Sequence, residues 1–300
     1  MQIALKIDVD TYLGTLQGVP ALVADLGSRG VHASFYFSLG PDHTGRALRR
    51  VFRPGFLQKV ARTSVVSHYG IRTLLYGVLL PGPHIARRAG SILRAVRDAG
   101  HETGIHCYDH VYWQDHVMGQ NESWTRTQVM RAVGAYREAF GTHARSHCAA
   151  GWQVNAHLFA LEDELGLSYA SDTRGTHPFL PVMDGIEGRC PQLPTTLPTL
   201  DELVGIDGAT VDDAIDQILE RCRTQDTQAH VFTLHAELEG QQFRKPFLRL
   251  IDTWLTEGHS IGTLQALRAN LNPTQLPKHT VSMREIPGRS GVLATQGPAL

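Results

Sequence analysis

The sequence predicts one α/β domain built on a parallel sheet, either open or closed into a barrel. Short β-like runs alternate with amphipathic helical runs along most of the chain, and this is the pattern of repeated strand–helix units. Acidic residues and histidines stand directly after several of the strand-like runs, where parallel sheets gather their functional groups. A chain of 300 residues with 42% apolar residues is long enough for one such domain.

The first half of the chain carries three strand-like and three helical runs in alternation. The strands are apolar or alternate apolar with polar residues, and the helices end at glycines such as Gly30 and Gly141. Strands are expected at residues 3–9, 31–39 and 101–107, and helices at 19–30, 84–100 and 125–141.

The second half continues the pattern with weaker strands. Strands are expected at 146–152 and 167–172 and at the start of 229–240, and helices at 154–166, 211–224 and 243–258. The acidic start of the 211–224 helix suits the helix dipole. We therefore expect a catalytic domain at 1–271 with an insert at about 43–83. Residues 272–300 are rich in Pro, Gly and Thr without periodicity, which predicts a disordered tail.

The N-terminus and the cysteines indicate the cellular compartment in which the protein is expected. "MQIALKIDVD" has no long apolar leader and reads as a first strand, and no run approaches the roughly 20 apolar residues that span a bilayer. The four cysteines are widely spaced without a CxxC pair, which argues against a disulfide framework or a structural zinc site. We expect a cytoplasmic protein with no nucleic-acid partner.

The stretch "GHETGIHCYDHVYW" raises the question of a metal site. His106 and His110 are four residues apart, a spacing that places two imidazoles on one face of a helical turn. Asp10, from "DVD" after the first strand, would complete a set of two histidines and one carboxylate that leaves positions open for water and substrate. The alternative is a pair of surface histidines. Cys107, between them, would face away and pack in the core.

Three further residues are candidates for proton transfer. Asp8 would take a proton from water, His235 after "VFTL" would give one to a leaving amine, and Asp172 would orient one of these groups or pair with Arg174. Each has a plainer alternative: a turn for the DxD, a structural histidine, and an ordinary ion pair.

Five motifs then resemble the polysaccharide deacetylase family, carbohydrate esterase family 4. They are "IDVDT", "GHETGIHCYDH", "AAGW", "YASDTRG" and "TLHAELEG", and the resemblance runs from about residue 2 to 270. It implies a distorted (β/α) barrel and metal-dependent hydrolysis of an N-acyl sugar.

The resemblance also implies a role for each matching residue. Asp8 matches the catalytic base, His235 the general acid and Asp172 the carboxylate that tunes the site. Asp10, His106 and His110 match the metal ligands. The ion implied is Zn²⁺, with Mn²⁺ or Co²⁺ as alternatives, and the residues assigned to substrate binding are Arg174, Trp152, Glu237 and Glu102.

The chain departs from the family pattern at two points. The usual adjacent acidic pair is split by Val9, which leaves the division of roles between Asp8 and Asp10 less clear. The arginine of the third motif is absent from "SHCAAGW", and Arg174 is expected to replace it.

Within the family, the resemblance indicates the branch that removes a formyl group from a polyprenyl-phosphate-linked formamido-arabinose. That reaction serves lipid A modification and resistance to cationic peptides such as polymyxin. Two alternatives stay open: an N-deacetylase of a cell-wall or other glycan, and a non-catalytic barrel that binds a glycan or lipid.

The basic and apolar composition of the insert predicts contact with the inner-membrane surface. Residues 43–97 hold 11 of the 28 basic residues and none of the 29 acidic ones. Basic segments with apolar residues bind anionic headgroups, although a helical excursion packed on the barrel is the alternative. The residues expected to contact lipid are Arg46, Arg49, Arg50, Leu74, Leu75 and Leu79.

Overall fold

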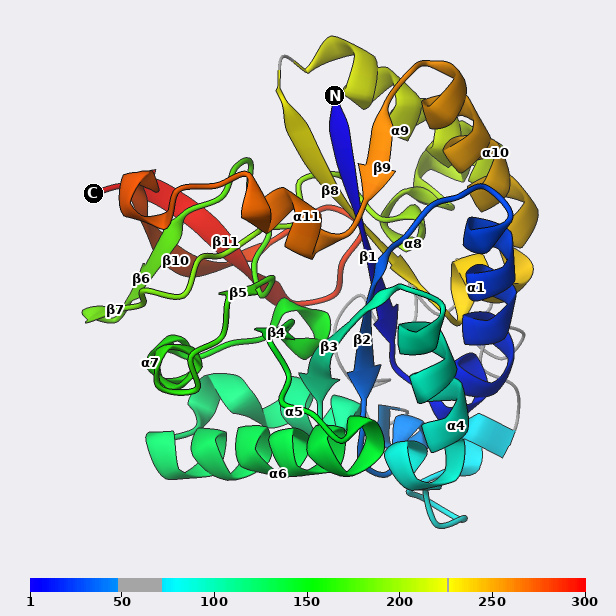
Figure 1. Ribbon diagram of the computed structural model, residues 1–300. Helices are drawn as coiled ribbons and strands as arrows, with labels where there is room; N and C mark the ends of the chain where they lie inside the picture. The colour runs from blue at the N-terminus through cyan, green and yellow to red at the C-terminus, as the bar shows by residue number, and fades with distance from the viewer. Residues whose placement is uncertain (48–71, 226) are drawn as a thin grey trace.

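The computed structural model describes residues 1–47, 72–225 and 227–300. Its centre is a parallel, curled sheet with the strand order β5-β4-β3-β2-β1-β8, to which β9 adds beside β1 (Figure 1). This arrangement confirms the predicted α/β class. The strands are β1 (Gln2–Val9), β2 (Ser34–Ser38), β3 (Glu102–Cys107), β4 (Ser146–His147), β5 (Tyr169–Ala170), β8 (Ala229–His235) and β9 (Ser260–Gly262).

Strand β1 lies in the middle of this sheet. It pairs with β8 from Gln2 to Asp8 and with β2 from Lys6 to Val9. The short β9 pairs with its first three residues instead of β2. A parallel strand with neighbours on both sides is buried, and β1 is buried from Ile3 to Val9 even though Lys6 and Asp8 are polar. Its carboxyl end therefore delivers the acidic residues Asp8 and Asp10 to the centre of the fold.

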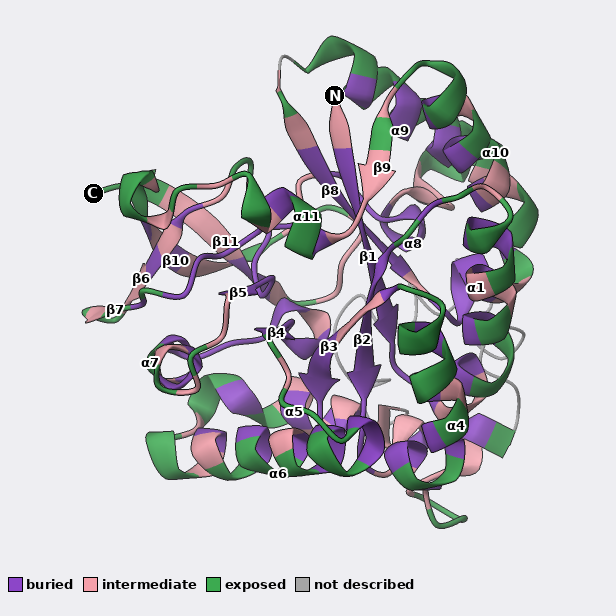
Figure 2. Cartoon of the chain, in the orientation of Figure 1, coloured by how far each residue is buried: buried purple, intermediate pink, exposed green. Residues whose placement is uncertain are grey.

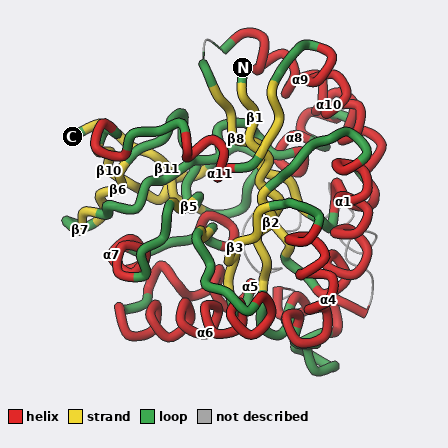
Figure 3. Tube along the Cα trace, viewed as in Figure 1, coloured by secondary structure: helices red, strands yellow, loops and turns green. Residues whose placement is uncertain are grey.

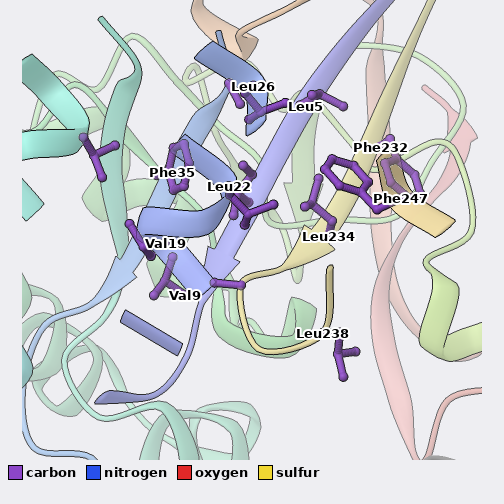
Figure 4. Packing of buried hydrophobic residues seen from close by; sticks show 14 of the residues in the cluster. Leu5, Val9, Val19, Leu22, Leu26, Phe35, Phe232, Leu234, Leu238 and Phe247 are labelled. Carbon is purple, nitrogen blue, oxygen red and sulfur yellow. The ribbon is translucent and has the colours of Figure 1, made fainter. Parts of the chain in front are cut away.

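The helices cover the sheet with their apolar faces inward (Figure 2). Figure 4 shows α1 and α10 side chains packed against β1, β2 and β8: Val19, Leu22, Leu26 and Phe247 meet Leu5, Val9, Phe35, Phe232 and Leu234. Each such side chain stabilises the fold by about 1.5–3 kcal/mol when fully buried. The helices are α1 (Val19–Gly27), α4 (Ile85–Asp98), α5 (His110–His116), α6 (Glu122–Phe140), α7 (Ala156–Glu164), α8 (Leu200–Leu203), α9 (Val211–Thr224), α10 (Arg244–Thr256) and α11 (Leu264–Ala269).

The C-terminal segment is ordered, and the predicted disordered tail is wrong. Strands β10 (Lys278–Glu285) and β11 (Val292–Ala299) form an antiparallel pair. They extend a second sheet in the order β11-β10-β6-β7, with β6 (Leu180–Met183) and β7 (Ile186–Glu187) (Figure 3). Val281, Leu293 and Ala294 are buried there. The composition misled because β10 pairs with β6, about a hundred residues earlier, and local periodicity carries no trace of such a partner.

The predicted insert is described only in part. Arg49 and Arg50 lie outside the described residues, whereas Arg46, Leu74, Leu75 and Leu79 lie within them. Residues 72–75 are helical, and residues 76–80 form a turn that projects beyond the end of the sheet to which β1, β2 and β3 point (Figure 1). In the part of the chain that is described, no helix combines the length and the apolar character needed to cross a membrane.

Candidate metal and catalytic site

Three predicted ligands converge at the carboxyl ends of β1 and β3. The Nε2 atom of His106 lies 3.2 Å from Asp10 Oδ1, and Nε2 of His110 lies 3.3 Å from the same oxygen. Their ligand atoms all lie within 4.8 Å of one another. Two imidazoles and one carboxylate are a donor set that divalent ions accept.

The two histidines reach this point by a route that differs from the predicted helical turn. His106 belongs to strand β3, and His110 is the first residue of α5. Asp109 caps that helix by accepting a hydrogen bond from Tyr112 N. The cap turns the chain sharply, so that the two rings still face one site with centroids 5.3 Å apart. Cys107 is buried against the core and bonds to Ser38, as expected for a packing residue.

The surroundings fix the orientation of these ligands. His106 Nδ1 lies 2.9 Å from the Cys148 carbonyl oxygen and 3.0 Å from its Sγ atom, which directs Nε2 toward Asp10. The backbone of Asp10 donates to Glu237 Oε1 at 3.1 Å, and Thr11 N and Oγ1 donate to the same oxygen, each at 2.8 Å. Glu237, assigned to substrate binding from the sequence, is buried and instead holds the loop that carries Asp10.

One carboxylate oxygen in this cluster supports metal binding. Asp10 Oδ1 is buried and receives no hydrogen bond within the described structure. Such an oxygen is costly unless a partner compensates it. Burial alone would raise the pKa of Asp10, but the two imidazoles beside it, those of His110 and His106, outweigh burial and hold the pKa well below its usual value. A bound cation would satisfy the same oxygen, so the donor set fits a divalent ion.

The two predicted proton-transfer residues lie next to each other at the carboxyl ends of β1 and β8. Asp8 and His235 are register partners on the adjacent strands β1 and β8. Asp8 is buried, and its Oδ1 accepts a hydrogen bond from Cys148 Sγ at 3.3 Å. The backbone of His235 donates to Glu239 Oε2 at 2.8 Å, and its ring Nδ1 is buried with no hydrogen-bond partner in the described structure.

Asp172 lies apart from these groups. Its carboxylate accepts hydrogen bonds from Ala149 N at 2.6 Å and Gln192 Nε2 at 2.9 Å, and lies 3.0 Å from His147 Nδ1. Burial would lower the pKa of His147, but Asp172 and Glu162 raise it to about 10. Asp172 therefore holds the chain around Ala149 through a buried ion pair. In the described part of the chain it makes neither the predicted pair with Arg174 nor a hydrogen bond or ion pair with Asp8 or His235.

Arg174 and Trp152 are also placed differently from the sequence-based expectation. Arg174 is buried, forms an ion pair with Glu202 and donates to the Leu197 carbonyl oxygen. Trp152 is 2% exposed, and the guanidinium of Arg174 lies 5.1 Å from its ring centroid. Both polar groups are engaged within the protein in this structure, and their assignment to substrate binding stays a prediction.

Glu102 is the first residue of β3 and lies at the amino end of that strand. It stands four positions before His106, which is about 13 Å along an extended strand. Its carboxylate accepts hydrogen bonds from Tyr169, Ser34 and Gln265 N. It therefore stabilises the opposite end of the sheet, and its assignment to substrate binding stays a prediction that this position does not support.

Two residues at the site were not found from the sequence. Cys148 contacts both His106 and Asp8, and Lys6 lies beside Asp8. The alternation of Lys6, Asp8 and Asp10 along one strand could have indicated Lys6, since residues two apart share a face. Cys148 follows the two-residue strand β4, and no local pattern marked it.

Comparison with known proteins decides the family. The chain is 35% identical over 250 residues to the probable 4-deoxy-4-formamido-L-arabinose-phosphoundecaprenol deformylase ArnD of Shewanella sediminis, covering 83% of this chain and 80% of that protein. It is 30% identical over 286 residues to the protein of the same name from Wigglesworthia glossinidia brevipalpis, covering 95% and 98%. This chain belongs to the ArnD deformylase family. No family model matches it.

The fold of this ArnD family member also matches solved structures. A Mycobacterium smegmatis protein described as a polysaccharide deacetylase superposes with a TM-score of 0.64 at 18% identity, covering 95% of this chain and 94% of that one. At this identity the likeness shows the fold alone. It confirms the predicted distorted barrel of the polysaccharide deacetylase type.

Proposed function

We propose that this chain is a metal-dependent amide hydrolase that removes the formyl group from 4-deoxy-4-formamido-L-arabinose-phosphoundecaprenol. The products are formate and the free 4-amino-4-deoxy sugar on the same lipid carrier, for use in lipid A modification and resistance to cationic peptides such as polymyxin. The observation that carries the proposal is the cluster at the sheet edge. Three candidate ligands converge there, with Asp8 and its register partner His235 at the same edge of the sheet, in a chain that aligns with ArnD relatives over most of its length.

Asp10, His106 and His110 would hold the metal ion. When bound, a divalent ion supplies Lewis acidity, which lowers the pKa of water and polarises a carbonyl group. Zinc is the first choice. Manganese and cobalt are alternatives, because two imidazoles and one carboxylate do not select a single ion.

The chain's own residues move the protons. Asp8 accepts the proton that the attacking water loses as the new C–O bond forms at the formyl carbon. His235 donates a proton to the sugar nitrogen as the C–N bond breaks, so that the amine leaves neutral. Glu237 and Cys148 keep Asp10 and His106 in position during this exchange through the hydrogen bonds described above.

The proposal is tested with purified protein and two matched lipid substrates. One carries the formamido sugar, and the other carries the same sugar with an acetamido group. We expect formate release from the first, faster than acetate release from the second, and loss of both with a chelator. Faster acetate release would favour an N-deacetylase, and no release from either would favour a binding protein.

We also propose that the protein works as a peripheral protein at the cytoplasmic face of the inner membrane, where its lipid-linked substrate is held. Val78 and Leu79 at the tip of the projecting turn are 54% and 75% exposed. Leu74 and Leu75 are only partly exposed, so Leu79 is the predicted lipid-contacting leucine that projects furthest.

The tip is braced to the metal-ligand helix. His43 Nδ1 lies 2.5 Å from Asp109 Oδ2, and Arg46 Nε donates to the Gly77 carbonyl oxygen at 3.2 Å. Asp109 directly precedes the ligand His110. An apolar tip near the site supports insertion among lipids while the sugar reaches the ligands.

Vesicle binding tests the membrane proposal. Leu79→Glu should reduce co-sedimentation with anionic vesicles several-fold, because a charge on the tip opposes insertion. Leu255→Glu, at a 38% exposed leucine on α10, is the matched control. Equal loss in both variants, or none in Leu79→Glu, would remove the tip from the membrane contact.

A further inference from the structure

Lys6 is a fully buried cation beside the proposed general base. It lies on β1 with an exposure of 0%, and its Nζ atom is 3.7 Å from Asp8 Oδ2. The ammonium also donates to the Ser171 carbonyl oxygen at 2.9 Å and lies 5.1 Å from the Trp152 ring centroid. A buried charge is costly unless an opposite charge and hydrogen bonds compensate it. Of these three partners, Asp8 is the anionic one.

The sequence places this lysine on the functional face of the strand. Side chains alternate along a strand, so Lys6, Asp8 and Asp10 point to one side while Leu5, Ile7 and Val9 point to the other. The latter three are completely buried in the apolar core. The side of β1 that bears Lys6 is therefore the side that carries the site.

The other cations around Trp152 are engaged elsewhere. Arg174 forms an ion pair with Glu202, and Arg289 forms ion pairs with Asp201 and Glu202. The arginine of the third motif is absent from this chain, and Arg174 contacts Glu202 instead of Asp8. Lys6 is the cation that the structure brings against Asp8.

We propose that Lys6 is the positioning residue for Asp8, holding its carboxylate in the orientation that accepts the proton from water. This inference rests on the proposed function, in which Asp8 is the base. Each carboxylate oxygen of Asp8 has its own partner: Cys148 Sγ donates a hydrogen bond to Oδ1, and Lys6 Nζ lies beside Oδ2. The distance of 3.7 Å makes the second interaction a charge–charge contact, and the bond to Ser171 in turn keeps the ammonium in place.

Kinetics of single and double variants test this role. Lys6→Met removes the charge and keeps the length, and should lower kcat about 10²-fold with KM and metal content unchanged, a loss typical of a disabled general base. Lys6→Arg should recover most of kcat, because it restores the cation. Lys6→Met in an Asp8→Asn background should cause no further loss, since both changes disable the same unit.

Controls separate this inference from the proposed function. Lys245→Met removes an exposed lysine on α10 and should leave kcat unchanged. If Lys6→Met does not fold, judged by circular dichroism, Lys6→Gln takes its place. A kcat within a few-fold of wild type, or effects of the Lys6 and Asp8 changes that multiply, would overturn the positioning role. An inactive wild type would instead overturn the proposed function.

Discussion

Asp8 and Asp10 stand two residues apart on β1, and the structure gives them different surroundings. Asp10 meets the two histidines, whereas Asp8 meets Lys6 and Cys148. We predict that Asp8→Asn retains a stoichiometric metal ion and loses turnover about 10²–10⁴-fold, because an amide cannot accept the proton. Metal analysis and formate release on the same preparation measure both quantities.

Asp10→Asn is the variant to compare with Asp8→Asn. It should lose metal and turnover together while circular dichroism shows an intact fold, since an open catalytic site contributes little to folding. Loss of the metal from Asp8→Asn would mean that Asp8 is a ligand and that the roles across Val9 are reversed.

Glu239 gives a residue-scale prediction for pH. Burial raises the pKa of this carboxyl group to about 8, although its hydrogen bond from His235 N lowers it. The unfolded chain releases the same proton near pH 4.3, so the folded state holds more protons between these values. Stability from this group is therefore fully present below about pH 4.3 and is lost as pH rises through about 8. Glu239→Gln cannot ionise and should escape that loss.

Urea unfolding of the metal-free protein measures this effect. The variant should gain free energy of unfolding relative to wild type between about pH 5 and about pH 9, on the order of a few kcal/mol. Glu285→Gln, an exposed glutamate on β10, is the control and should follow wild type. A constant difference across this range would show that Glu239 does not hold its proton in the folded state.

At the scale of elements, an ion-pair cluster fixes the loop between β10 and β11 to helix α8. Arg289 Nη1 lies 3.0 Å from Asp201 Oδ2, and its Nε lies 2.8 Å from Glu202 Oε1, with all three side chains nearly buried. We predict that Arg289→Ala lowers the free energy of unfolding by about 3–5 kcal/mol, because it leaves buried carboxylates without their partner. Denaturant titration measures the change.

Arg284→Ala is the matched control on β10, where the side chain is exposed and donates a hydrogen bond to Ser282 Oγ. It should leave stability within about 0.5 kcal/mol of wild type. If Arg289→Ala were equally neutral, the hairpin would not be anchored as described.

The elements also show how far sequence reasoning reaches. Helix α6 ends at Gly141 as expected, because the chain there adopts φ 72°, a conformation that favours glycine. The strands β1 and β8 could be predicted equally well from their local sequences. The two-residue strands β4 and β5 and the second sheet depend on distant partners, so local pattern either overextended them or missed them.

In the candidate site, too, residues with a local signal could be predicted and residues with distant partners could not. Ligand identities at Asp10, His106 and His110 could be predicted because they sit in recognisable motifs at strand ends. The partners of Asp172 and Arg174 could not, since His147, Glu162 and Glu202 reach them only through the tertiary fold. Lys6 was visible as an alternating residue, but nothing local distinguished it from an ordinary surface lysine.

At the scale of the whole molecule, the two ends of the central sheet serve different purposes. The amino end is closed by the hydrogen bonds of Glu102. The carboxyl end gathers the ligands, the proton-transfer residues and the projecting turn (Figure 1). In the proposed function a lipid tail fixes the substrate in the membrane, and the projecting turn at this end would face that membrane.

Metal titration of the metal-free protein tests the central claim most directly. Formate release from the formamido-sugar lipid is measured as zinc is added in known amounts, together with the zinc bound. The account predicts that activity rises in proportion to zinc and reaches its plateau at about one ion per chain, and that Asp10→Asn shows neither binding nor activity. Full activity in the metal-free protein, or activity in Asp10→Asn equal to wild type, would contradict it.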